Sequence, residues 1–482
     1  MKWFLVILIL GLAAADETCL SGDEDPYLLF GTKTAYIFAN RGLPNLKTHD
    51  VPGCAPIAFW LLTRRGSHNP EAEEIESLQQ LVKFKENILS NYRTQLSDID
   101  VRIRCVYMLI CAADRSLLAE WTWSPRHNAT FAGEITTDGY MSTQQLAQAW
   151  RQKFPGLLTR NTYNYLFKFA TDQPSRVSFR AFTEGLFGSE AEGFDIPKDN
   201  DERLVDPFKN CPTWTKNVED NNETLTQRQI FETKMDYKRM ITEISRRLGF
   251  KYDIDRNTVL SMYQMCRYFK AWEVAQISPW CAVFTKEDLK RLEYAEDLET
   301  YYKYGYGQRL HKKIGCLPIK DMYNFFSNHI SKELPQLPLS MVTFTSAPVL
   351  LTTLATLNTH EDLTPPTGDN FNFQNNSGQS RKWTTSTMAP YNGNLAAVLY
   401  KCTPNGKFQV NDEYQVLFLE NEKPSYMEGC RVGLCDWTFV KNRFAELVKN
   451  CDLEFCNGAE RTAFGFSLAV IGFLVSRFTL QF

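Results

Sequence analysis

The sequence has no excess of positive charge, since 53 lysine and arginine residues face 56 aspartate and glutamate residues, for a net charge of −3. This balance argues against a nucleic-acid-binding protein that relies on a broad basic surface. The sequence has no Cys-x-x-Cys pair and no glycine-rich nucleotide loop, and its six histidines are not spaced as metal ligands. We therefore expect no nucleic-acid partner, no metal and no cofactor. A local pocket of arginines for a small phosphate ligand is compatible with this composition.

Long hydrophobic runs are also missing, and the apolar stretches at the two chain ends are too short for a comfortable membrane span. The first residues, MKWFLVILILGLAAADET, predict a signal peptide over residues 1–15 and entry into the secretory pathway. Near the other end, Asn457 begins a small-residue site before an apolar tail, which is typical of a lipid-anchor signal over 457–482. We therefore expect a protein that is lipid-anchored at the cell surface. A terminal transmembrane helix and an untethered secreted protein are the alternatives.

Cysteine is abundant, with 13 residues, and in an exported chain this number predicts disulfide bonds. The odd count leaves one cysteine free or paired between chains. Three Asn-x-Ser/Thr sequons, at Asn128, Asn222 and Asn375, agree with export and predict glycosylation sites.

Strand and helix patterns alternate along the chain, which predicts an α/β core. Residues 55–65 read as a buried strand, and an amphipathic helix pattern follows residue 70. The connecting stretch LLTRRGSHNP, residues 61–70, therefore joins a strand to a helix, where free backbone N–H groups and the helix dipole favour an anion. A loop rich in Asp, Asn and Lys precedes the long helices in the middle of the chain, which marks an inserted helical domain.

Several stretches resemble the histidine acid phosphatases, and among them the multiple inositol polyphosphate phosphatases. They are EDPYLLFGTKTAY near the start, SPWCAVFTKEDLKRLEYAEDLETYYKYGYG with GCLPIKDM in the middle, and LYKC near the end. The resemblance implies a core sheet flanked by helices, over 25–194 and 336–456, with a mostly helical cap over 195–335. It also implies disulfides Cys54–Cys402 and Cys266–Cys281. Proximity in sequence alone adds Cys451–Cys456.

The resemblance further implies a catalytic loop of the form RHGxRxP, in which the histidine attacks phosphorus and the arginines hold the phosphate. Arg64, Gly66 and Pro70 match this form. Arg65, however, occupies the position of the nucleophilic histidine, and His68 occupies that of the second arginine. We expect Arg64, Arg65 and His68 to bind phosphate.

A second motif of the family, His-Ala-Glu, supplies a phosphate contact and the acid that protonates the leaving group. Here Ser346 replaces the histidine and Pro348 replaces the glutamate. In a third segment, TDQPSRVSF, we expect Pro174 to disrupt the family pattern and Arg176 to miss the phosphate.

Two functions follow from these residues. The first is an extracellular protein similar to the inositol polyphosphate phosphatases that binds a phosphate ligand, such as an inositol polyphosphate, or interacts with a partner, without turnover. The second is an active phosphomonoester hydrolase with an unusual active site. The replaced residues at 65, 346 and 348 favour the first, because an arginine has no free lone pair with which to attack phosphorus.

Overall fold

The computed structural model describes residues 19–20, 25–40, 49–94, 109–189, 191, 195–199, 201–332, 336–371, 381–403 and 412–457. The expected signal peptide, the sequon at Asn375 and the tail after Asn457 lie outside these residues. Within them, no helix combines the length and the apolar character that crossing a bilayer requires.

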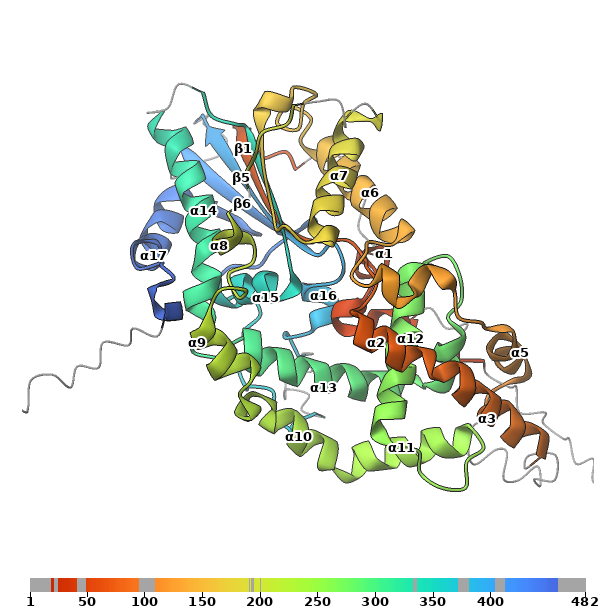
Figure 1. Ribbon diagram of the computed structural model, residues 1–482. Coiled ribbons are helices and arrows are strands. Elements are labelled where there is room, and N and C mark those ends of the chain that lie inside the picture. Colours follow the sequence, from red (N-terminus) through yellow and green to blue (C-terminus); the bar gives the residue numbers. More distant parts are fainter. Residues whose placement is uncertain are drawn as a thin grey trace, which may run out of the picture.

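A mixed sheet forms the centre of the core (Figure 1). β1 (Cys54–Arg64) lies parallel to β4 (Ser340–Thr345), which in turn lies parallel to β2 (Tyr165–Phe169). On its other side β1 pairs antiparallel with β5 (Asn394–Cys402), and β6 (Tyr414–Glu420) follows β5. These strands are buried on both faces, which explains their nearly unbroken apolar sequences.

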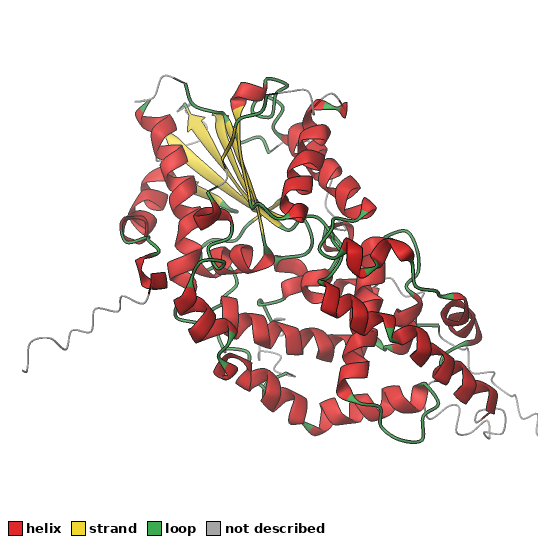
Figure 2. Cartoon of the chain, in the orientation of Figure 1, coloured by secondary structure: helices red, strands yellow, loops and turns green. Residues whose placement is uncertain are grey.

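Helices cover both faces of the sheet, as Figure 2 shows. Alternate residues of β1 point to opposite faces. Phe59 and Leu61 pack with α6 (Thr137–Lys153) and α7 (Gln173–Phe187), whereas Trp60 and Leu62 pack with helices of the other layer. That layer contains α14 (His311–Ser331), α15 (Ala347–Thr356) and α17 (Trp437–Lys449). The predicted α/β core flanked by helices is confirmed.

A second, helical body packs below the sheet around its own apolar cluster. It contains α10 (Thr226–Thr233), α11 (Met235–Arg247), α12 (Arg256–Trp272) and α13 (Lys286–Tyr304), together with the earlier helices α2 (Ala72–Gln79), α3 (Leu81–Thr94) and α5 (Ala112–Glu120). Its limits therefore differ from the expected insertion over 195–335. The early helices join this body because their apolar faces, with Leu78 and Ile88, are buried in its cluster. α14 lies instead against the sheet, where Phe326 is buried.

The described residues contain six disulfides, and the thirteenth cysteine, Cys105, lies outside them. Cys54 is bonded to Cys402, across the paired strands β1 and β5. Cys266 in α12 is bonded to Cys281 in the short helix η9 (Pro279–Val283).

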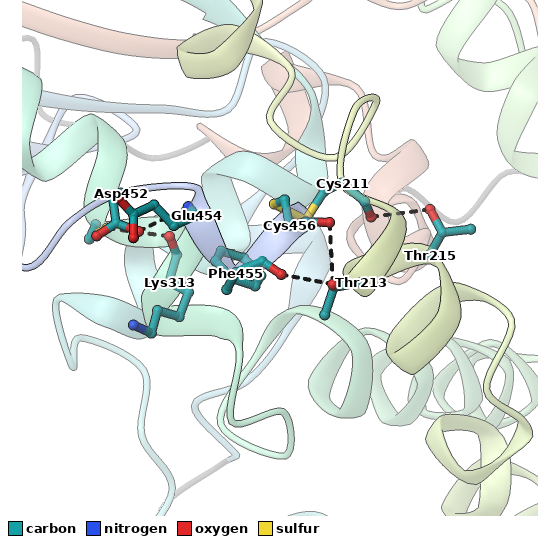
Figure 3. The surroundings of a disulfide bond; sticks show 9 residues. Cys211, Thr213, Thr215, Lys313, Asp452, Glu454, Phe455 and Cys456 are labelled. Carbon is teal, nitrogen blue, oxygen red and sulfur yellow. Dashed lines mark hydrogen bonds between the residues drawn. A yellow bond between two sulfur atoms is a disulfide. The ribbon is translucent and has the colours of Figure 1, made fainter. Parts of the chain in front are cut away.

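The expected Cys451–Cys456 bond is wrong, because each of these cysteines pairs with a distant one. Cys451 is bonded to Cys316, and Cys456 is bonded to Cys211. Figure 3 shows the second bond, beside which the Thr213 hydroxyl donates to the carbonyl of Phe455 at 2.8 Å. The last described residues are thus fixed against the segment that follows Cys211, and nearness in sequence did not predict the pairing.

Candidate active site

The loops after β1 and β4 meet at one edge of the sheet because these strands are parallel. Arg64 ends β1 and pairs with Thr345, which ends β4. Ser346 then occupies the position directly before the first residue of α15. In open α/β sheets, ligands bind beyond this carboxyl edge.

A cavity of about 420 Å³ opens at this edge, between the sheet and the helical body. Its walls include all five positions that the family resemblance singled out: Arg64, Arg65, His68, Ser346 and Pro348. Residues separated by almost 300 positions in the sequence therefore share one site, as the resemblance implies. The volume suits a small organic ligand.

Arg64 is a buried anchor of this site, with 5% of its surface exposed. Its Nη1 donates to the carbonyl of Ala389 at 2.9 Å and to that of Thr32, and its guanidinium lies 4.2 Å from the centre of the Tyr391 ring. Burial lowers the pKa of Arg64 to about 10, so it stays charged at neutral pH. The β1 loop thus brings a fixed positive charge to the cavity.

The backbone of the β1 loop does not offer its first N–H groups to a ligand. The N–H groups of Arg64 and Arg65 donate to the carbonyls of Gly393 and Thr345, and that of Gly66 donates to the Ser178 hydroxyl. The expectation that the loop N–H groups hold an anion is therefore wrong for these three groups. Any side chain at Gly66 would collide with α6, since a Cβ there would lie 2.6 Å from the carbonyl oxygen of Gly139.

Arg65, at the position of the family's nucleophile, forms an ion pair with Asp172. Its Nη1 lies 3.4 Å from Oδ1 of Asp172, and both side chains are partly exposed. Asp172 also caps α7 by accepting from the N–H of Ser175 at 2.9 Å. Arg65 brings a second positive charge to the cavity but no group that can attack phosphorus.

His68 brings an imidazole side chain to the cavity, and this ring is neutral. Its Nδ1 lies 2.9 Å from the carbonyl oxygen of Gly66, which only accepts, so Nδ1 carries the proton and Nε2 keeps its lone pair. Burial lowers the pKa of His68 well below its usual value, and the charge of Arg65 lowers it further. The ring meets the Tyr391 ring edge-on, with centroids 5.4 Å apart.

The loop after β4 contributes a helix N-terminus without an acid. Ser346 and Pro348 line the cavity at the first turn of α15, and the Ser346 side chain does not cap the helix. Pro348 fits this position because a proline is well accommodated in the first helical turn. Pro348 has no ionisable group, and the hydroxyl of Ser346 is too weak an acid to protonate a leaving group at neutral pH.

The third segment forms the start of α7. Pro174 stands in its first turn, where a proline is well accommodated. Arg176 is exposed and lies outside the cavity wall.

Part of the cavity wall is formed by residues that were not predicted from the sequence. Thr32 and Lys33 of η2 (Gly31–Lys33) contribute, as does Tyr391. Residues at helical spacing on α12 and α13 also line the wall, among them Leu260, Gln264, Arg267, Tyr268, Leu292, Glu296, Glu299 and Thr300. That spacing was visible in the sequence, but it is equally typical of a helix face that packs against a neighbour.

Comparison with known proteins places this geometry in a family. Residues 71–419 match the histidine phosphatase superfamily (branch 2). The chain is 30% identical to multiple inositol polyphosphate phosphatase 1 of Drosophila melanogaster over 94% of this chain and 93% of that protein. Its identity to the protein of the same name from Homo sapiens is 26%, over 88% and 87% of the two chains.

Solved structures share the fold. The phytase from D. castellii superposes with a TM-score of 0.66 at 14% identity, over 90% of this chain and 87% of the phytase. The multiple inositol polyphosphate phosphatase of Bifidobacterium longum, in complex with inositol hexasulfate, gives 0.58 at 12% identity, over 84% and 94%. With the matched region covering most of the sequence, the chain belongs to the histidine phosphatase superfamily, branch 2.

Proposed function

We propose that this protein binds a phosphate-bearing ligand in the cavity without hydrolysing it. One observation carries the proposal: the cavity still presents basic side chains, while Arg65 and Pro348 stand where the family's reaction needs a nucleophile and an acid. The relatives are named as inositol polyphosphate phosphatases, which supports a phosphorylated ligand of this general class.

The lack of turnover follows from two separate losses. Without a nucleophile at position 65, no covalent phosphoryl intermediate forms there. Without an acid at position 348, the departing alkoxide receives no proton, and general acid catalysis alone contributes about 10²–10⁴-fold. The two losses affect opposite sides of the same in-line displacement, the attack on phosphorus and the departure of the alkoxide, so neither compensates for the other.

Binding is supported by positive charge in the cavity wall. Arg64 is buried and Lys33 is half-buried there, and the carbonyl of Thr32, the residue before Lys33, accepts from Arg64. The N-terminus of α15 adds the positive end of a helix dipole. A phosphate oxygen in this place has charge-assisted donors within reach.

Hydrolysis with His68 as the nucleophile is a second candidate function. The neutral ring with a lone pair on Nε2 favours it, since this is the state that an attacking imidazole requires. Against this candidate, the His68 side chain leaves the backbone three residues after the position of the family's nucleophile. A misplacement of about 1 Å costs roughly 100-fold in rate, so we rank this candidate second.

We further propose that the protein is exported and lipid-anchored through Asn457, or is released as a secreted protein. Six disulfides support an oxidising compartment. Asn457 is exposed, directly after the buried Cys456. Glycosylation at Asn222 is supported by its exposure, while Asn128 is half-buried and its side-chain oxygen accepts from Trp123.

Titration calorimetry of the full mature protein with inorganic phosphate tests the binding, and released phosphate measured with inositol hexakisphosphate tests the turnover. The proposal expects heat of binding, and phosphate release no faster than without protein. Absence of binding, or clear release of phosphate, would contradict it.

A further inference from the structure

The cavity wall carries acidic side chains in almost the same number as basic ones. We propose that its ligand has a single phosphate group on an uncharged, hydroxyl-bearing body, and is not a ring that bears many phosphates. This inference rests on the proposed function, and it narrows the class of ligand.

The charge of the wall is the first argument. Five lysine and arginine residues, including Lys33 and Arg65, line the cavity together with four glutamates. The formal charge of the wall is therefore one positive charge. A ligand with many phosphates brings many negative charges. Burying charges without opposite partners is costly, so this wall matches a ligand of low charge.

Two of the basic residues are already paired with the glutamates. Arg267 contacts Glu296 and donates to the carbonyl of Phe30 at 3.1 Å. Arg228 contacts Glu299 and lies 3.0 Å from Glu232. Arg267 keeps the pKa of Glu296 well below its ordinary value, so this carboxylate stays charged and its arginine stays occupied. Neither arginine brings an uncompensated charge to a ligand.

The other basic residues of the wall are Arg64, Arg65 and Lys33, of which Arg65 is paired with Asp172, outside the wall. Arg64 donates to carbonyl oxygens and not to a carboxylate, and it lies on the β1 loop with Arg65. Lys33 follows Thr32 in the sequence, and the carbonyl of Thr32 accepts from Arg64. These three residues, with the first turn of α15, form one place for one phosphate.

The rest of the wall suits hydroxyl groups. It presents the rings of Tyr263, Tyr268 and Tyr391, together with Glu71 and Glu74. The Tyr268 hydroxyl donates to Glu74 at 3.0 Å. A carboxylate only accepts hydrogen bonds, so it attracts a ligand hydroxyl and repels a second phosphate.

Calorimetry of the intact protein at about 0.15 M salt, where the Debye length is about 8 Å, compares inositol 1-phosphate with inositol hexakisphosphate. We expect the hexakisphosphate to bind less than about tenfold more tightly than the monophosphate, a difference below about 1.4 kcal/mol. A larger preference for the hexakisphosphate would overturn the inference and leave the proposed function intact. Turnover of either ligand would instead overturn the proposed function, and the preference would then be judged from their KM values.

Glu74→Gln tests the charge directly. Glutamine keeps an oxygen that accepts from Tyr268, and the substitution removes one negative charge. We expect it to strengthen binding of the hexakisphosphate by about threefold or more, and binding of the monophosphate by less. Glu73→Gln is the matched control, because Glu73 is exposed on the same helix and lies outside the cavity wall. Equal effects of Glu74→Gln on both ligands would overturn the inference.

Discussion

The guanidinium of Arg65 lies 3.4 Å from the carboxylate of Asp172, and the same carboxylate caps α7 by accepting from the N–H and the hydroxyl of Ser175, each at 2.9 Å. One aspartate therefore holds both the start of a core helix and the residue at the family's nucleophile position. The loop after β1 therefore accommodates an arginine at this position.

Replacing Arg65 separates stability from binding. The Arg65–Asp172 pair is partly exposed, so Arg65→Ala is expected to lower the free energy of unfolding by less than about 1 kcal/mol in urea titration. Phosphate affinity should fall about five- to tenfold, because a charge-assisted contact is lost. Arg203→Ala is the control, since Arg203 pairs with Asp201 outside the cavity wall. Equal phosphate affinity of the two variants would argue against a role of Arg65 in binding.

Restoring the family residues should restore hydrolysis only when they are changed together. Arg65→His alone is expected to add little phosphate release, since residues 68, 346 and 348 still differ from the family. The combination of Arg65→His, His68→Arg, Ser346→His and Pro348→Glu should exceed every single change, because catalytic residues that act as a unit are not additive. A glutamate at 348 is also compatible with the first turn of α15, where negative charge is favoured. Rates with a generic phosphomonoester check this, and full rescue by one substitution would contradict it.

Acid should destabilise the protein through His127. Nδ1 of His127 donates to Asn69 in the β1 loop at 2.7 Å, and its ring stacks on Trp272 with centroids 3.9 Å apart. Burial, together with the smaller effect of the nearby Arg126 charge, lowers the pKa of His127 to about 4. A histidine in the unfolded chain has a pKa of about 6.5. Its contribution is therefore complete above pH 6.5 and is lost as the pH falls toward 4.

The variant His127→Phe isolates this effect, because phenylalanine keeps the stacking and does not titrate. Between pH 6.5 and 4, the unfolding free energy of the wild type should fall by up to about 3 kcal/mol more than that of the variant. Urea titrations at several pH values measure the difference. Parallel curves for the two proteins would show that His127 does not titrate in this way.

The disulfides should differ in how much they contribute to the free energy of unfolding. Cys54 and Cys402 are 348 residues apart and join β1 to β5, so replacing both by alanine is expected to cost about 2–5 kcal/mol. Cys430 and Cys435 are 5 residues apart, and their replacement should cost less, because the loop that they close is short. Urea unfolding of both double variants under the same conditions makes the comparison, and equal losses would contradict it.

Much of the fold could be predicted because local rules decide it. The apolar run over residues 55–65 predicted β1. The pairing of Cys451 with Cys316 could not be predicted, since it depends on how α14 lies against the chain end. Spacing cannot supply such long-range packing.

The site could be predicted only in part, for the same reason. The family motifs located Arg64, Arg65, His68, Ser346 and Pro348, and the structure brings all five to one cavity. The opposing wall depends on how α12 and α13 face the sheet edge, so its glutamates and tyrosines had no signal of their own in the sequence. The use of the loop N–H groups by the protein itself was equally hidden.

The central claim is that the cavity binds phosphate without turning it over, and the phosphatase rate of the purified wild type tests it most directly. The rate of phosphate release from 4-nitrophenyl phosphate would be measured beside that of His68→Ala. We predict that both proteins release phosphate no faster than buffer. Clear release by the wild type that disappears in His68→Ala would contradict the account and identify His68 as the nucleophile.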